Sequence, residues 1–288
     1  MTPELTLPGP IVSVDWLSQH LHDPQVVIVD CRFSLADPTQ GRRAYDAGHL
    51  PTAQYLDLNR DLSSPVQAQG GRHPLPDLSA LAERLAACGI SSHPATVVVA
   101  YDDAQGAFAA RLWWLLRYVG HASVAVLDGG WQAWQRAGLP TTTTVMPRSP
   151  GQFQMQVQPG WVVDRATVQH QRAQGRVLID SRAPERFRGE VEPIDPIAGT
   201  IPGAANVFWK TMLDDHGCFL SPDALRERWA TWVAQDPIVF CGSGVTACVN
   251  LLAQAIAGYP LSPLYVGGWS DWCTTLTKPA DADGKADA

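Results

Sequence analysis

Short apolar runs alternate along the chain with longer segments of helical period. In the first half the apolar runs cover residues 26–29, 96–100 and 124–127, and a helical stretch fills residues 107–116. Continuous apolar strands that alternate with helices are typical of a parallel sheet covered on both faces. The pattern therefore predicts an α/β fold in which a parallel sheet is flanked by helices on both faces.

A cysteine-containing, glycine-rich loop joins the last long apolar run to the helix that follows. Residues 237–240 form a run of β type, and residues 247–256 have the composition of a helix. Between them stands Cys-Gly-Ser-Gly-Val-Thr, residues 241–246. A strand, a glycine-rich turn and a helix N-terminus form a cradle for an anion, because backbone N–H groups point inward and the helix dipole adds positive charge.

The position of Cys241 in this loop predicts a reactive thiol. The positive end of a helix favours the thiolate, which is the nucleophilic form of cysteine. Gly242 and Gly244 allow the loop to curl around the sulfur, and Ser243 and Thr246 offer hydroxyls. The plainer interpretation is a buried and inert cysteine, which is common for free thiols. The glycines and hydroxyls leave little apolar packing after Cys241, so we expect a nucleophile.

The two halves of the chain resemble each other. Three pairs of segments recur in the same order and at nearly constant spacing: 26–32 with 176–182, 48–53 with 199–204, and 129–134 with 267–272. Solenoid repeats are only roughly 20–50 residues long, so this spacing predicts a duplicated domain. We expect an N-terminal domain over residues 1–142, a Thr- and Pro-rich linker over 143–160, a C-terminal domain over 161–277 and a disordered tail over 278–288.

The first copy lacks the cysteine. When the two Gly-Gly-Trp motifs are aligned without gaps, Asp103 stands opposite Cys241 and Gly106 opposite Gly244. A carboxylate is not a sulfur nucleophile and repels anions. We therefore expect the first domain to be catalytically silent and to shape the cleft, since sites often lie between domains.

Composition and charge exclude several classes of function. The chain has 288 residues, of which 45% are hydrophobic and 17% charged, as expected for a soluble protein of two domains. A net charge of -7 gives no basic surface for nucleic acid. We find no apolar run of transmembrane length and no signal peptide, so we expect a cytoplasmic protein without a membrane partner. Six scattered cysteines without a C-x-x-C pair predict no disulfide framework, metal site or cofactor.

The duplication, the silent first copy and the late 241–246 loop resemble the tandem-domain rhodanese-like sulfurtransferases over nearly the whole chain. The loop is similar to that of the 3-mercaptopyruvate sulfurtransferases. Thiosulfate sulfurtransferases usually carry basic residues where this chain has Gly242 and Ser243. The resemblance implies two rhodanese-like α/β domains and no cofactor. It also implies sulfur transfer from 3-mercaptopyruvate, a small anionic donor, through a Cys241 persulfide to cyanide or a thiol such as thioredoxin or glutathione.

The resemblance also implies a proton relay of serine, histidine and an acid. Ser243 matches the serine and His73 the histidine, and histidine suits proton transfer near neutral pH. A simple turn residue between glycine and proline is the plainer interpretation of His73. The acid falls near Asn59, so Asp57 or Asp61 would have to take its place.

For the donor, the resemblance implies a basic binding site. Arg186 matches the arginine that holds the donor's anionic end, with Arg188 nearby, although a surface arginine in a charged loop is the plainer interpretation. The second arginine of the mercaptopyruvate pattern corresponds to Asp195, and Arg72 or Arg188 would compensate. The loop residues expected around the transferred sulfur are Gly242, Gly244, Val245 and Thr246.

Three alternatives remain open at the level of sequence. A thiosulfate sulfurtransferase would use the same cysteine with another donor and cyanide as acceptor. A cysteine phosphatase needs an arginine at the far end of its loop to bind phosphate bidentately, where this chain has Ala247. A non-catalytic module would keep the fold and bind sulfur or a partner without turnover.

Overall fold

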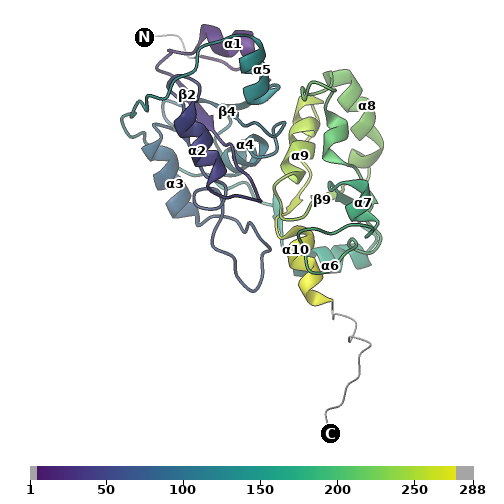
Figure 1. The fold of residues 1–288 in the computed structure, drawn as a ribbon. Helices are drawn as coiled ribbons and strands as arrows, with labels where there is room; N and C mark the ends of the chain where they lie inside the picture. The colour runs from purple at the N-terminus through teal and green to yellow at the C-terminus, as the bar shows by residue number, and fades with distance from the viewer. Residues whose placement is uncertain (1–4, 277–288) are drawn as a thin grey trace.

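The computed structural model describes residues 5–276, and within them two five-stranded sheets form the centres of two lobes (Figure 1). The first sheet has the order β1 (Ile11–Val12), β5 (Val124–Leu127), β4 (Val97–Tyr101), β2 (Val26–Asp30) and β3 (Gln54–Tyr55). The second has the order β6 (Val162–Val163), β10 (Leu264–Tyr265), β9 (Ile238–Phe240), β7 (Leu178–Asp180) and β8 (Ala205–Asn206). All pairings between these strands are parallel. The two sheets share one topology, which confirms the predicted fold class.

The helices of both lobes follow the strands in the same alternation. The first lobe contains α1 (Val14–Gln19), α2 (Gln40–Ala47), α3 (Leu78–Ala87), α4 (Ala109–Tyr118) and α5 (Gly130–Arg136). The second contains α6 (Arg165–Ala173), α7 (Pro184–Phe187), the 3-10 turn η1 (Trp209–Met212), α8 (Pro222–Val233), α9 (Ala247–Ile256), α10 (Gly268–Trp272) and the 3-10 turn η2 (Cys273–Thr275). Side chains that accept a backbone N–H fix where several helices begin, among them Ser13, Asp77, Asp164 and Ser221.

Each sheet is buried on both faces, which explains the continuous apolar runs. In β2, Val27 and Val29 pack into the cluster that includes α3 and α4, whereas Val26 and Ile28 pack into the cluster beside α1, α2 and α5. The second sheet divides in the same way between α8 and α9 on one face and α6 and α10 on the other. Successive side chains of a strand point to opposite faces, so a strand covered on both sides is apolar over most of its length, with a polar residue only at its end in β2 and β7.

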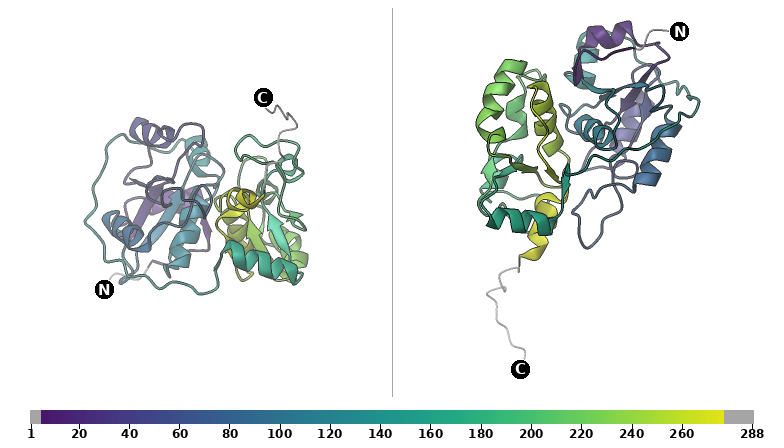
Figure 2. Two further views of the ribbon diagram at one scale, coloured as in Figure 1. Left: turned by 90° about the horizontal axis from the view of Figure 1, so that it is seen from below. Right: turned by 180° about the vertical axis from the view of Figure 1, so that it is seen from behind.

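The two lobes share one hydrophobic cluster. Helix α4 packs against helix α9, and residues of both, including Trp113, Trp114, Val249 and Leu252, are completely buried in the same cluster. Figures 1 and 2 show α9 on the side of the second lobe that faces the first. Because this contact is packed as densely as a domain core, it holds the first domain in one position next to the Cys241 loop.

Residues 143–160 contain no helix or strand, and part of this segment lies along the first domain. Arg148 donates to the carbonyls of Val26 and Pro24, and the amide of Gln152 donates to Ser91. The proposed domain limits stay a prediction, and the tail expected over residues 278–288 lies outside the described residues. Among the described residues no helix has the length and apolar character needed to span a membrane.

Candidate active site

Cys241 directly follows β9, at the carboxyl edge of the second sheet, and its loop leads into α9. Gly244 has a φ of 70°, and a Cβ at this position would lie 2.5 Å from the carbonyl oxygen of Val266. Only glycine fits there. The carbonyl of Cys241 accepts the amide of Trp269 at 2.8 Å, so α10 holds the start of the loop. The Cys241 side chain is nearly enclosed, with 2% exposure.

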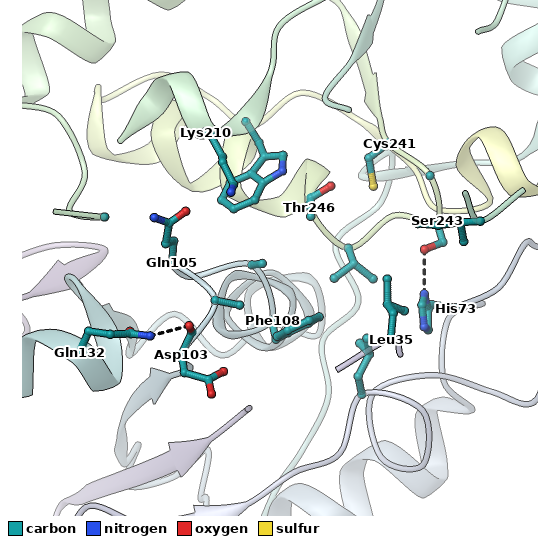
Figure 3. Close-up of a pocket in the computed structure, with 18 of the residues that line it drawn as sticks. Leu35, His73, Asp103, Gln105, Phe108, Gln132, Lys210, Cys241, Ser243 and Thr246 are labelled. Carbon is teal, nitrogen blue, oxygen red and sulfur yellow. Dashed lines mark hydrogen bonds between the residues drawn. The ribbon is translucent and has the colours of Figure 1, made fainter. Parts of the chain in front are cut away.

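A pocket of about 660 Å³ opens in front of Cys241, between the two domains (Figure 3). The second domain contributes the Cys241 loop and the turn η1 with Trp209 and Lys210. The first domain contributes apolar side chains, Leu35 and Phe108, and farther from the cysteine a polar group with Asp103, Gln105 and Gln132. The volume is within the range of pockets for small-molecule substrates.

Ser243 and His73, which are 170 residues apart in sequence, share a hydrogen bond of 2.7 Å between Oγ and Nδ1. Both side chains are buried. His73 lies on a segment of the first domain that is hydrogen-bonded to α10. The backbone amide of Arg72 donates to the Ser270 hydroxyl at 3.1 Å. Burial, together with the charges of Arg111 and Arg72, lowers the pKa of His73 to about 3. The imidazole is therefore neutral at physiological pH.

Within residues 5–276 no carboxylate contacts His73. The Asp57 carboxylate accepts the amides of Asn59 and Arg60 at 2.8 and 3.0 Å, in the turn after β3. The Asp61 carboxylate accepts the amide of Asp57 and pairs with Arg84. Both acids are used to build this turn, so the structure brings neither of them to the relay.

Two guanidinium groups lie over Gly242. A Cβ at Gly242 would be 3.0 Å from Nη2 of Arg72 and 3.8 Å from Nη1 of Arg186. Arg186 pairs with Glu192 at 2.6 Å and with Asp195 at 3.1 Å, and Arg72 also pairs with Asp195. Burial raises the pKa of the Asp195 carboxyl, and the two arginines oppose that shift. The site therefore has two cations whose charge is largely balanced by buried acids.

Arg188 is not brought to this site. Its guanidinium pairs with Glu190 at 2.6 Å, and its side chain is 53% exposed. Helix α7 is a single turn, and Arg188 forms its C-cap, so its side chain leaves the helix in a different direction from Arg186. Arg72, from the first domain, takes the place beside Arg186 that Arg188 was expected to share.

The structure corrects the residue that stands opposite Cys241 in the first domain. The carbonyl of Asp102 accepts the amide of Trp131 at 2.8 Å, as that of Cys241 accepts the amide of Trp269. Trp131 follows Asp102 by 29 residues, whereas Trp269 follows Cys241 by 28 residues, so the first domain has one more residue in this stretch. A gapless alignment therefore gives Asp103 instead of Asp102.

The first loop is occupied by its own anion. The Asp102 carboxylate is completely buried. It accepts four backbone amides at 2.8 to 2.9 Å, those of Ala104, Gly106, Phe108 and Ala109. A loop of this kind thus binds an anion with main-chain donors alone.

Both halves of the chain match the family model of the rhodanese-like domain, over residues 13–137 and 164–275. The chain belongs to the tandem-domain rhodanese-like sulfurtransferases. A probable 3-mercaptopyruvate sulfurtransferase of Pseudomonas aeruginosa is 46% identical over 276 residues, which cover 93% of this chain and 96% of that relative. A putative thiosulfate sulfurtransferase of Mycobacterium tuberculosis is 41% identical, with 89% and 90% covered. The solved 3-mercaptopyruvate sulfurtransferase from Leishmania major has a TM-score of 0.81 at 29% identity, over 93% of this chain and 75% of that one.

The other cysteines of this sulfurtransferase are free thiols that lie outside the pocket. Burial raises the pKa of each, to about 11 for Cys88 and about 12 for Cys248, and also for Cys31, Cys218 and Cys273. They remain protonated at neutral pH. No group of side chains suited to a metal ion occurs among the described residues.

Arg111 contacts the Cys241 loop of this sulfurtransferase, although no sequence motif marks it. Helix α4 of the first domain places Arg111, which is completely buried, against the Cys241 loop, where it donates to the Gly244 carbonyl at 3.0 Å. The sequence does contain a feature that points to this residue: Arg111 is a charged residue within the otherwise apolar helical stretch 107–116. Charged side chains are almost never fully buried without a reason.

Proposed function

We propose that this enzyme transfers sulfur from 3-mercaptopyruvate to a thiol or to cyanide through a persulfide on Cys241. The observation that carries the proposal is the hydrogen bond between Ser243 and His73 beside a cysteine in a neutral loop. A neutral loop with a hydroxyl suits a donor whose leaving group needs a proton. Thiosulfate, a dianion without a proton to transfer, gains more from basic residues in the loop.

The carboxylate of the donor binds between Arg72 and Arg186. Both guanidinium groups lie over Gly242, next to Cys241, and guanidinium binds carboxylate through paired hydrogen bonds. Asp195 and Glu192 remove much of the positive charge. The nearly neutral surroundings favour a monoanionic donor over a dianionic one, because the two acids repel a second negative charge on the donor.

In the first step the Cys241 thiolate attacks the sulfur of 3-mercaptopyruvate. A bond forms between the two sulfur atoms, the bond from sulfur to C3 of the donor breaks, and its electron pair remains on the pyruvate enolate. The proton of the donor thiol moves to C3 and gives pyruvate, so Cys241 is left as a persulfide anion. The loop amides and the start of α9 stabilise that anion without a metal.

Ser243 passes this proton while hydrogen-bonded to His73. Because His73 has a pKa of about 3, an imidazolium is unfavourable at neutral pH, and the proton does not rest on the histidine. We propose that it moves from the donor thiol through the Ser243 hydroxyl to C3, with His73 fixing the hydroxyl. A relay of this kind does not require Asp57 or Asp61.

In the second step the acceptor removes the outer sulfur. A thiol attacks the outer sulfur of the persulfide, the bond between the two sulfurs breaks, and the thiol leaves as a persulfide while Cys241 regains its thiolate. Cyanide leaves as thiocyanate. The pocket of about 660 Å³ is of a size that suits a small thiol such as glutathione. We propose a cytoplasmic location for the enzyme, because thiols of this kind are kept reduced there.

Steady-state kinetics with 3-mercaptopyruvate and thiosulfate, each with cyanide as acceptor, test the proposal. We expect a higher kcat/KM for 3-mercaptopyruvate. Mass spectrometry after donor alone should show a gain of one sulfur atom on Cys241 that a thiol removes. Faster turnover with thiosulfate would reverse the assignment of donor, and absence of any sulfur gain with either donor would favour a non-catalytic module.

Replacement of Arg186 by alanine is expected to raise KM for 3-mercaptopyruvate by about tenfold or more. The loss of a hydrogen bond between charged groups costs about 1.5–3 kcal/mol. The fold should survive, because Glu192 keeps Arg182 and Asp195 keeps Arg72 as partners. Arg188→Ala, two residues away and on the surface, is the matched control and should leave KM unchanged. Equal KM values for the two variants would remove Arg186 from the donor site.

A further inference from the structure

Arg111 is a buried cation for which residues 5–276 provide no acidic partner. Its side chain is completely buried, and it forms no salt bridge with a described carboxylate, whereas the buried Arg32 and Arg182 pair with Asp30 and Asp180. A charge removed from water is costly unless hydrogen bonds and an opposite charge compensate it. Among the described residues, the charge of Arg111 is thus met by carbonyl acceptors and not by an acid.

The hydrogen bonds of Arg111 reach both segments that form the active site. Nη1 donates to the Gly244 carbonyl at 3.0 Å, and Nη2 donates to the His73 carbonyl at 3.3 Å. Nε has no partner among the described residues. One side chain of the first domain thus holds the catalytic loop of the second domain and the backbone of the histidine that contacts Ser243.

The bond to Gly244 fixes one peptide unit of the loop. The carbonyl and the N–H of a trans peptide point in opposite directions. Since the Gly244 carbonyl points to Arg111 and to the Cys248 thiol, the N–H of Val245 points away from α4, and Val245 lines the pocket. In the first domain the amides of the corresponding loop bind the Asp102 carboxylate, which illustrates the anion that oriented amides favour.

Two thiols lie near the guanidinium of Arg111. The Cys248 thiol on α9 donates to the same Gly244 carbonyl as Arg111, at 3.4 Å, and Cys241 stands three residues before Gly244 in the same loop. Burial lowers the pKa of Arg111, and both thiols oppose this shift. Cys248 has a pKa of about 12 and stays a thiol at neutral pH, and His73 is neutral. Cys241 is therefore the remaining ionisable side chain of the loop that Arg111 contacts.

We propose that Arg111 is a positioning residue for sulfur transfer: it orients the Gly244–Val245 peptide of the loop and supplies the buried positive charge opposite the Cys241 anion. The inference rests on the proposed role of Cys241 as thiolate and persulfide. It also gives the silent first domain a part in the reaction, because α4 carries this charge. Neither function requires Arg111 to touch the substrate.

The rate of Cys241 alkylation by iodoacetamide, measured from pH 5 to 10, separates a charge effect from a structural one. Arg111→Met removes the charge and keeps most of the volume, and Arg111→Lys keeps the charge. Arg117→Met is the matched control, since Arg117 lies on the same helix, is partly buried over Trp113 and lines a different cavity. Near-UV circular dichroism and thermal melts establish that each variant is folded, and Arg111→Gln replaces Arg111→Met if the latter does not fold.

We expect Arg111→Met to move the pH midpoint of alkylation upward by about one unit, which is about a tenfold loss of reactivity at pH 7, while Arg111→Lys and Arg117→Met stay close to wild type. A folded Arg111→Met or Arg111→Gln variant with a wild-type midpoint would overturn the proposal. An equal loss in Arg111→Lys and Arg111→Met at an unchanged midpoint would also overturn it, because only packing would then matter. Wild-type enzyme that gains no sulfur from a donor would instead contradict the proposed function, whatever the alkylation profile.

Discussion

Replacement of Cys241 by serine is expected to abolish sulfur transfer, with kcat/KM for 3-mercaptopyruvate reduced by about a thousandfold or more. A serine hydroxyl stays protonated at neutral pH and does not form a persulfide, so the covalent route is lost completely. Serine replaces only the sulfur, by a smaller oxygen, so nothing is crowded and the loop should keep its shape. The measurement is cyanide-dependent thiocyanate formation, together with the mass of the protein after incubation with donor.

The matched control for this change is Cys218→Ser. Cys218 is a partly exposed thiol of the second domain that does not line the pocket. The control should keep its activity and should still gain one sulfur atom. Substantial activity in Cys241→Ser, at an unchanged melting temperature, would mean that another residue receives the sulfur.

Removal of the Ser243 hydroxyl is expected to lower kcat for 3-mercaptopyruvate by about a hundredfold and to leave thiosulfate turnover within about twofold. Proton transfer by a positioned group typically contributes roughly 10²–10⁴-fold, and only the mercaptopyruvate reaction needs a proton at its leaving group. The Ser243→Ala variant, assayed with both donors at pH 7, gives the comparison directly.

The pH profile adds a second criterion to this prediction. Burial, with Arg111 and Arg72, holds the pKa of His73 at about 3, so His73 does not titrate between pH 5 and 8. The kcat of the wild type should therefore show no loss of activity that is due to His73 in that interval. A decline centred near pH 6.5 that disappears in His73→Asn would show that the histidine becomes charged during turnover. Parallel losses with both donors in Ser243→Ala would mean that Ser243 supports the loop and does not carry a proton.

The first domain contributes polar and charged side chains to this site, in addition to apolar ones. His73 and Arg72 come from its 70–73 segment, and Arg111 comes from its helix α4. In its own loop the backbone amides are occupied by the Asp102 carboxylate, whereas in the other loop we propose that the amides stabilise a persulfide. The first domain thus has Asp102 at the position of Cys241, and it places His73, Arg72 and the buried Arg111 beside the Cys241 loop.

Features that depend on a local pattern follow from the amino-acid sequence alone. Apolar runs such as residues 124–127 predicted buried parallel strands, and helix α9 (Ala247–Ile256) lies where its composition placed it. The duplication followed from repeated segments, and the Cys-Gly-Ser-Gly sequence marked Cys241 because its glycines have a local backbone purpose. These properties are encoded by neighbouring residues, so they are readable without the fold.

Which distant side chains meet at Cys241 depends on how the two domains pack against each other. Arg72 and not Arg188 lies beside Arg186, since that choice depends on how a first-domain segment docks on α10. Neither Asp57 nor Asp61 contacts His73, because the turn after β3 uses both carboxylates for its own hydrogen bonds. The packing of α4 on α9 brings Arg111 under the loop. The contacts of Arg72 and Arg111 join residues more than a hundred positions apart. No local pattern encodes them, because they arise from the burial of apolar surface between the two domains.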